Sequence, residues 1–158
     1  MGKVTNYKIY VELLWWIASI IVAGLIVLPI YTLFNVYPYL MFINVGSIVL
    51  TINLFRYIVA FKKSPLSNIR WLKKLFVFIN IGIGMFMLNR YQYAKILLEE
   101  ITPSTFGKLG NLFFSEIDSF FYFEKEFMFF IIGTLICLFV LELVLIRSIW
   151  KQDFAEEI

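Results

Sequence analysis

Three charged side chains lie inside long apolar segments of this 158-residue chain. Glu12 lies in YVELLWWIASIIVAGLIVLPIY, Arg56 in YLMFINVGSIVLTINLFRYIVAF, and Glu142 in FMFFIIGTLICLFVLELVLIR. Two carboxylates and one guanidinium permit two kinds of chemistry. The arginine fork can bridge both acids and clasp helices together. Alternatively, an acid that keeps the freedom to titrate can carry a proton or a cation through a membrane.

The segments around these charges predict the fold. The chain is 61% hydrophobic and 16% charged, whereas soluble domains average about 45–50% apolar and about 25% charged residues. About 20 mostly apolar residues suffice for a helix to cross the hydrocarbon core. Four segments qualify, at about 11–31, 39–61, 75–94 and 127–147. We expect an all-α integral membrane protein, a four-transmembrane-helix bundle that forms one domain over residues 1–158.

The basic residues predict its orientation. The loop 62–74 joins the second and third segments and carries Lys62, Lys63, Arg70, Lys73 and Lys74. In the connection 95–126, acidic residues outnumber lysines. Because loops rich in Lys and Arg stay in the cytoplasm, we expect both termini and the loop 62–74 to be cytoplasmic. The same loop is expected to attract anionic lipid headgroups. Frequent Ile, Phe, Asn, Lys and Tyr indicate an AT-rich genome, so we expect a bacterial inner membrane.

This orientation brings the three charges to a common depth. Each lies about 6–9 Å along its helix from a basic residue that flanks the segment, at about 1.5 Å per residue. We therefore expect an intramembrane charge cluster of Glu12, Arg56 and Glu142, provided that the first, second and fourth helices are neighbours. Both roles, the clasp and the proton or cation site, remain open at this point.

Helical periodicity predicts which faces pack. Residues three and four positions apart share a helix face, and small residues on that face let membrane helices approach closely. The expected packing stripes contain Trp16, Ser19 and Ala23 in the first helix, Gly46 and Asn53 in the second, and Asn80 and Gly84 in the third. Gly133 and Cys137 form a further small-residue face in the fourth segment, which we expect to meet another subunit.

The connection 95–126 is dense in aromatic residues towards its end. Aromatic side chains favour the headgroup level of a membrane, so an outer-leaflet anchor is the expected role. A docking surface for a partner is the alternative, with Phe113, Phe114, Phe120 and Phe121 as its candidates. The acids of this connection are expected to form a solvated face.

Several chemistries have no residues to support them. The chain has no histidine, and its single cysteine, Cys137, cannot form an internal disulfide. Histidine is the commonest general base and a frequent metal ligand, and no metal-binding or nucleic-acid-binding motif is present. We expect no enzymatic activity, no metal or other cofactor, and no nucleic-acid partner.

Two functions remain. The first is a non-catalytic accessory, scaffolding or assembly subunit of a multi-protein membrane complex. The second is a small proton- or cation-coupled transporter or channel that uses Glu12 and Glu142, with a homo-oligomer as one arrangement. Four spans with a glutamate in the first resemble the small multidrug-resistance transporters. The long connection 95–126, the basic loop and the second acid depart from that family's pattern, and its activity is not transferred to this chain.

Overall fold

Four helices lie side by side in the computed structural model, which describes residues 2–35, 37–61, 64, 70–100 and 116–156. They are α1 (Gly2–Val27), α2 (Pro38–Val59), α3 (Arg70–Glu100) and α5 (Glu116–Glu156), and a 3₁₀ segment, η1 (Leu28–Asn35), follows α1. Each of the four is long and apolar enough to span a membrane. The expected all-helical class with four such helices is therefore confirmed over the described residues, which contain no strand.

Prolines set two of the helix boundaries. Pro29 follows the end of α1, and Ile30 beside it leaves helical geometry at φ −118° and ψ 18°, as expected where a proline removes a backbone donor. Pro38 opens α2, where its missing N–H would have had no helical partner. The chain therefore turns between α1 and α2 through η1.

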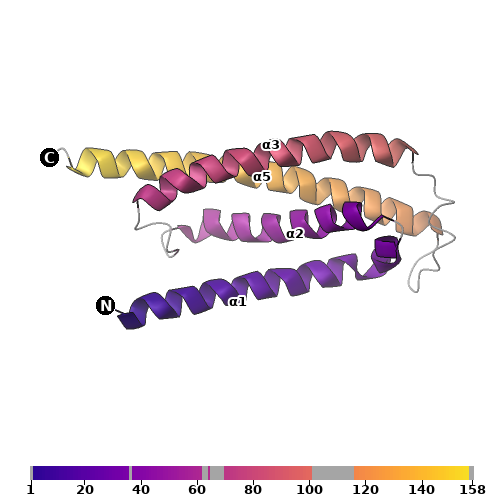
Figure 1. Ribbon diagram of the computed structural model, residues 1–158, viewed down its shortest axis with the longest axis horizontal. Helices are drawn as coiled ribbons and strands as arrows, with labels where there is room; N and C mark the ends of the chain where they lie inside the picture. The colour runs from indigo at the N-terminus through magenta and orange to yellow at the C-terminus, as the bar shows by residue number, and fades with distance from the viewer. Residues whose placement is uncertain (1, 36, 62–63, 65–69, 101–115, 157–158) are drawn as a thin grey trace.

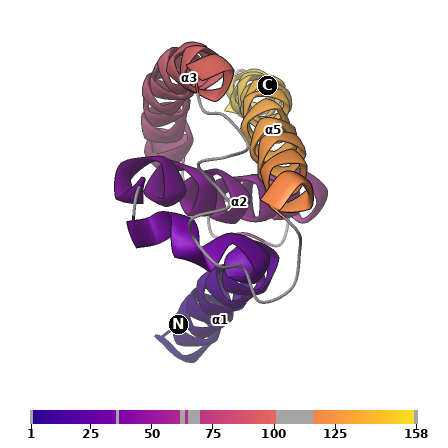
Figure 2. The same cartoon turned by 90° about the vertical axis from the view of Figure 1, so that its right-hand side faces the viewer.

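The helices pack in the order α1, α2, α5, α3. Helix α2 packs against both α1 and α5, and α5 packs against α3. Figure 2 shows the same arrangement end-on, with α2 between α1 and the pair formed by α3 and α5. The two termini lie at one end of the bundle (Figure 1). The N-terminal half of α1 and the C-terminal halves of α2 and α5 therefore share that end.

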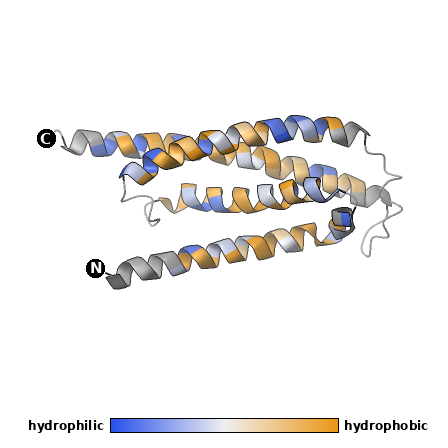
Figure 3. Ribbon diagram, in the orientation of Figure 1, coloured by the Kyte–Doolittle hydropathy of each residue, from blue (hydrophilic) through white to orange (hydrophobic). Residues whose placement is uncertain are grey.

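The buried side chains form two clusters along the bundle. One joins α1, η1, α2, the first part of α5 and the later part of α3, and its largest members include Met41, Ile48, Phe123 and Phe127. The other joins α2, α3 and the later part of α5 around Tyr57 and Leu141. Outside these clusters the helix surfaces are covered with exposed aliphatic and aromatic side chains. Figure 3 shows hydrophobic residues along each of the four helices. Such a surface suits hydrocarbon as its solvent.

The helices extend beyond the segments expected from hydropathy. Helix α5 begins at Glu116, upstream of the expected start at 127, and α3 begins at Arg70 and continues to Glu100. Arg70, Lys73 and Lys74 are thus helical rather than part of a loop, and Phe120 and Phe121 lie on α5. Amphipathic and aromatic turns can continue a helix past its apolar core, so a hydropathy window underestimates its length. Lys62, Lys63, Phe113 and Phe114 lie outside the described residues.

Candidate functional site

Glu12 and Arg56 form an ion pair between α1 and α2. Arg56 Nη2 lies 2.6 Å from Glu12 Oε2, and the two side chains are 16% and 17% exposed. Tyr57 donates its hydroxyl hydrogen to the other carboxylate oxygen, Oε1. The guanidinium also stacks over the rings of Trp15, at 5.2 Å, and Tyr57, at 5.5 Å. Both oxygens of Glu12 are therefore engaged by donors on α2.

Glu142 lies apart from this pair, which corrects the expected cluster of three charges. The contact that the structure gives it is with α3, where Asn80 Nδ2 lies 3.4 Å from Glu142 Oε2. Arg56 Nη1 is buried without a partner among the described residues, so its second fork does not reach Glu142. The cause is helical phase: Leu141 points into the core, and Glu142 is rotated about 100° from it, towards α3.

Glu142 lies at a shallow groove between α3 and α5. The groove has a volume of about 220 Å³, and its other lining residues are Asn80, Ile81, Gly84, Leu88, Leu135, Leu138 and Phe139. Ile81, Leu88 and Phe139 are largely exposed. The groove is therefore an apolar surface on the outside of the bundle that contains one carboxyl group and one amide.

A third acid, Glu126, is buried between α2 and α5. Asn44 Nδ2 donates to Glu126 Oε2 over 2.8 Å, Asn44 is fully buried, and Glu126 is 9% exposed. The expected solvated acidic face is therefore wrong for Glu126. The signal that could have revealed it is the buried stripe of α5: continuing from Thr134 in steps of three and four residues leads to Ile131 and Phe127, with Glu126 adjacent.

Hydroxyl groups continue the polar contact between α2 and α5. Thr51 and Thr134 lie 2.8 Å apart through their hydroxyl oxygens. Each hydroxyl also lies within hydrogen-bond distance of the carbonyl oxygens of Ser47 and Phe130. Because such bonds between membrane helices contribute about 0.6 kcal/mol each on average, this group stabilises the α2–α5 contact and fixes its register.

Some residues of the expected packing stripes are buried between helices, and others are not closely packed. Ser19 and Ala23 are buried on α1, and Asn53 Nδ2 donates to Ser19 Oγ over 2.8 Å across the α1–α2 contact. Trp16 is exposed, although its carbonyl accepts the Ser19 hydroxyl. At Gly46 no atom lies within 4 Å of where a Cβ would be, and at Gly84 the nearest is Leu138 Cδ1 at 4.0 Å.

The face formed by Gly133 and Cys137 is covered by this chain's own α2, which corrects its expected role as a partner contact. A Cβ at position 133 would lie 3.3 Å from Thr51 Cγ2. Cys137 is buried in the cluster that contains Leu54 and Tyr57. Small residues permit close approach, and here the helix that approaches belongs to the same chain. Among the aromatic candidates, Phe120 packs against the core and Phe121 is exposed.

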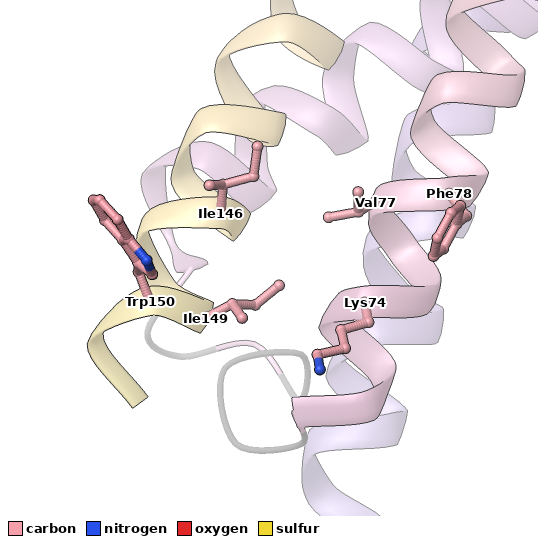
Figure 4. Close-up of a pocket in the computed structure, with 6 residues that line it drawn as sticks. All are labelled: Lys74, Val77, Phe78, Ile146, Ile149 and Trp150. Carbon is pink, nitrogen blue, oxygen red and sulfur yellow. The ribbon is translucent and has the colours of Figure 1, made fainter. Parts of the chain in front are cut away.

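The basic residues of α3 have different surroundings. Lys73 is 1% exposed, and its Nζ donates to Ser148 Oγ and Gln152 Oε1 of α5, each over 2.9 Å. Its expected contact with lipid headgroups is therefore replaced by a bond between helices. Arg70 is half-buried, and Lys74 is exposed. Lys74 borders a groove of about 240 Å³ between the ends of α3 and α5, shown in Figure 4, whose other walls are Val77, Phe78, Ile146, Ile149 and Trp150.

Known proteins give no further guidance: no protein-family model, curated protein or solved structure matches the chain significantly. Among the described residues, no group of three or more His, Cys, Asp or Glu side chains is placed to hold a metal ion. The functional interpretation therefore depends on the polar groups within the helices, and above all on the difference between Glu12, whose charge is paired, and Glu142, whose described partner is an amide.

Proposed function

We propose that the protein is a non-catalytic accessory, scaffolding or assembly subunit of a larger membrane complex. The observation that carries the proposal is Glu142, an acid in an apolar groove on the outer face of α3 and α5 whose described partner is Asn80. A charged side chain at a helix centre costs about 2.5–3.5 kcal/mol on insertion scales. A neighbouring subunit that supplies a cation would remove much of this cost.

The proposed occupant of the groove is a transmembrane helix of another subunit that carries a Lys or Arg at the depth of Glu142. Charge complementarity selects it, because the groove presents a carboxyl group to an otherwise apolar surface. Exposed Ile81, Leu88 and Phe139 would pack against the apolar part of that helix. A second copy of this chain suits the groove less well, since Arg56, a basic residue within the apolar part of α2, is already paired with Glu12.

Affinity purification of the tagged full-length protein from its native membrane in mild detergent, followed by native mass spectrometry, tests this proposal. Wild-type protein should co-purify stoichiometrically with another membrane protein. Phe139→Ala and Glu142→Gln should each reduce that yield at least tenfold. Phe129→Ala is the matched control, because Phe129 is on the same helix and equally exposed at 67% but does not line the groove. A wild-type protein that purifies alone would contradict the proposal, as would groove variants that retain the partner.

The alternative function is a small proton- or cation-coupled transporter or channel that uses Glu12 and Glu142. Glu12 suits this role poorly, because Arg56 and Tyr57 engage both of its oxygens. Glu142, which opens onto the groove, is the residue that supports it. Proton-flux measurements on reconstituted vesicles distinguish the two functions: a flux that Glu142→Gln abolishes would favour the transporter.

Anionic lipid is a further proposed partner, at the end of the bundle where both termini lie. The groove in Figure 4 has apolar walls suited to an acyl chain, and Lys74 at its edge is suited to a phosphate. Exposed Trp71 and Trp150 flank this region, as tryptophans do at membrane interfaces. The proposed location is a bacterial inner membrane, with this end of the bundle at the cytoplasmic leaflet.

A further inference from the structure

Glu126 and Asn44 meet in the core between α2 and α5, away from the groove at Glu142. The structure shows one hydrogen bond between them, in which Asn44 Nδ2 donates to Glu126 Oε2 over 2.8 Å. Each side chain has a second oxygen, Glu126 Oε1 and Asn44 Oδ1, and both of these atoms are buried without a hydrogen-bond partner. The two unsatisfied acceptors therefore belong to two side chains that are already hydrogen-bonded to each other.

Among the side chains that the structure describes, none supplies a cation to Glu126. Phe123 and Phe127, stacked with ring centroids 5.3 Å apart, belong to the apolar cluster on the same helix. The tyrosines packed against this cluster are Tyr37, Tyr91 and Tyr122, and Tyr122 donates to the carbonyl of Ile26 over 2.7 Å. The charged side chains described on the parts of α3 and α5 that reach this cluster are Glu124 and Lys125, which pair at 3.6 Å, and Arg90 and Lys95. Arg90 stacks over Tyr39 and Phe86, and Lys95 is exposed.

A single proton on the Glu126 carboxyl group would satisfy both acceptors. An ionised carboxylate accepts hydrogen bonds but donates none, whereas a carboxylic acid offers one O–H donor beside one acceptor oxygen. A primary amide offers the same complementary pair. An unsatisfied buried polar group costs about 1–3 kcal/mol, and a charged one costs more. The protonated acid is thus the form that matches Asn44.

We infer that Glu126 and Asn44 form a buried proton-binding site, in which Glu126 Oε1 carries a proton and donates a hydrogen bond to Asn44 Oδ1. The acid and the amide then exchange two hydrogen bonds and join α2 to α5. Loss of the proton leaves a buried carboxylate with one amide donor. The α2–α5 contact is therefore strongest when the site is loaded and weakens when it is empty.

Infrared spectroscopy of the full-length protein in lipid nanodiscs detects the bound proton directly. At mildly acidic pH the wild type should show the carbonyl stretch of a protonated carboxylic acid. Glu126→Gln should lose this band. Glu124→Gln is the matched control, two residues away and partly exposed beside Lys125, and it should keep the band. A wild-type spectrum without the band would overturn the inference, as would an unchanged band in Glu126→Gln.

Thermal unfolding provides a second, independent measurement. The Tm of the wild type should fall as the pH rises through neutral, because the proton leaves the site. Glu126→Gln should keep a Tm that is insensitive to this pH change, since its amide has the donor and the acceptor of the protonated acid. If Glu126→Gln does not fold, the infrared spectrum of Glu142→Gln tests the inference instead. The carboxylic acid band should persist in Glu142→Gln. Loss of the band in this variant would assign the proton to Glu142 and overturn the inference.

A sodium ion is the competing ligand, because two oxygen acceptors also suit a hard monovalent cation. Tm measurements at constant pH and ionic strength, with Na⁺ replaced by choline, separate the two. An equal wild-type Tm in both salts supports the proton. A Na⁺-dependent rise in Tm that is absent in Glu126→Gln would overturn the assignment to a proton.

Discussion

Glu12 receives a donor on each of its carboxylate oxygens, from Arg56 and from Tyr57. Arg56 is in turn held by the rings of Trp15 and Tyr57. Inside a membrane such contacts matter because an unpaired charge has no water to solvate it. The pair therefore joins α1 to α2 near the end where the termini lie.

Arg56→Ala should lower the stability of the protein by about 1–3 kcal/mol, since it leaves a largely buried carboxylate without its cation. The double variant Glu12→Gln/Arg56→Gln should lose less, because no charge remains unpaired. Thermal unfolding in detergent and the yield of folded protein measure both effects. An Arg56→Ala variant as stable as the wild type would show that the pair does not clasp the helices.

Helix α2 is the central element, and its contact with α5 depends on a glycine. Gly133 lets α5 approach Thr51 so closely that an added Cβ would lie 3.3 Å from Thr51 Cγ2. Thr51 has little freedom to move, because its hydroxyl lies 2.8 Å from Thr134 Oγ1 and from the Ser47 carbonyl oxygen. The small residue that hydropathy and spacing assigned to a partner surface thus serves the fold of this chain.

Gly133→Ala should therefore destabilise the protein, because overpacking costs about 1–3 kcal/mol. Gly46→Ala is the matched control on α2, where no atom lies within 4 Å of the added Cβ. There the substitution should be neutral or stabilise by about 0.5–1 kcal/mol, the usual gain of alanine over glycine in a helix. Unfolding free energies of the two variants in the same detergent provide the comparison. Equal effects at both positions would contradict the close packing at Gly133.

Across the whole molecule, four antiparallel helices bring both termini to one end (Figure 1). That end also contains the basic start of α3, with Lys73 bonded to the last turns of α5. Positive side chains in this region favour retention in the cytoplasm. The orientation proposed from the basic residues is thus compatible with the arrangement of the helices, and it remains a prediction to be measured.

Single cysteines introduced on a Cys137→Ser background test this orientation in intact cells. Lys108→Cys, in the connection after α3, should react with a membrane-impermeant maleimide from outside. Ser67→Cys, in the basic segment before α3, should react only after the membrane is permeabilised, because the predicted topology places it in the cytoplasm. Labelling of Ser67→Cys in intact cells would reverse the orientation.

Composition and apolar run length were sufficient to determine the helical class and the number of long apolar helices, because crossing hydrocarbon demands a minimum length and full backbone hydrogen bonding. The pairing of Arg56 with Glu12 could be predicted from their common depth along the helices, whereas the separation of Glu142 from this pair could not. Only the tertiary structure decided that Glu142 faces α3, that Gly133 packs on Thr51, and that Glu126 is buried against Asn44. Rotation of each helix about its axis determines these contacts, and rotation follows from how side chains of several helices interlock, which no single segment specifies.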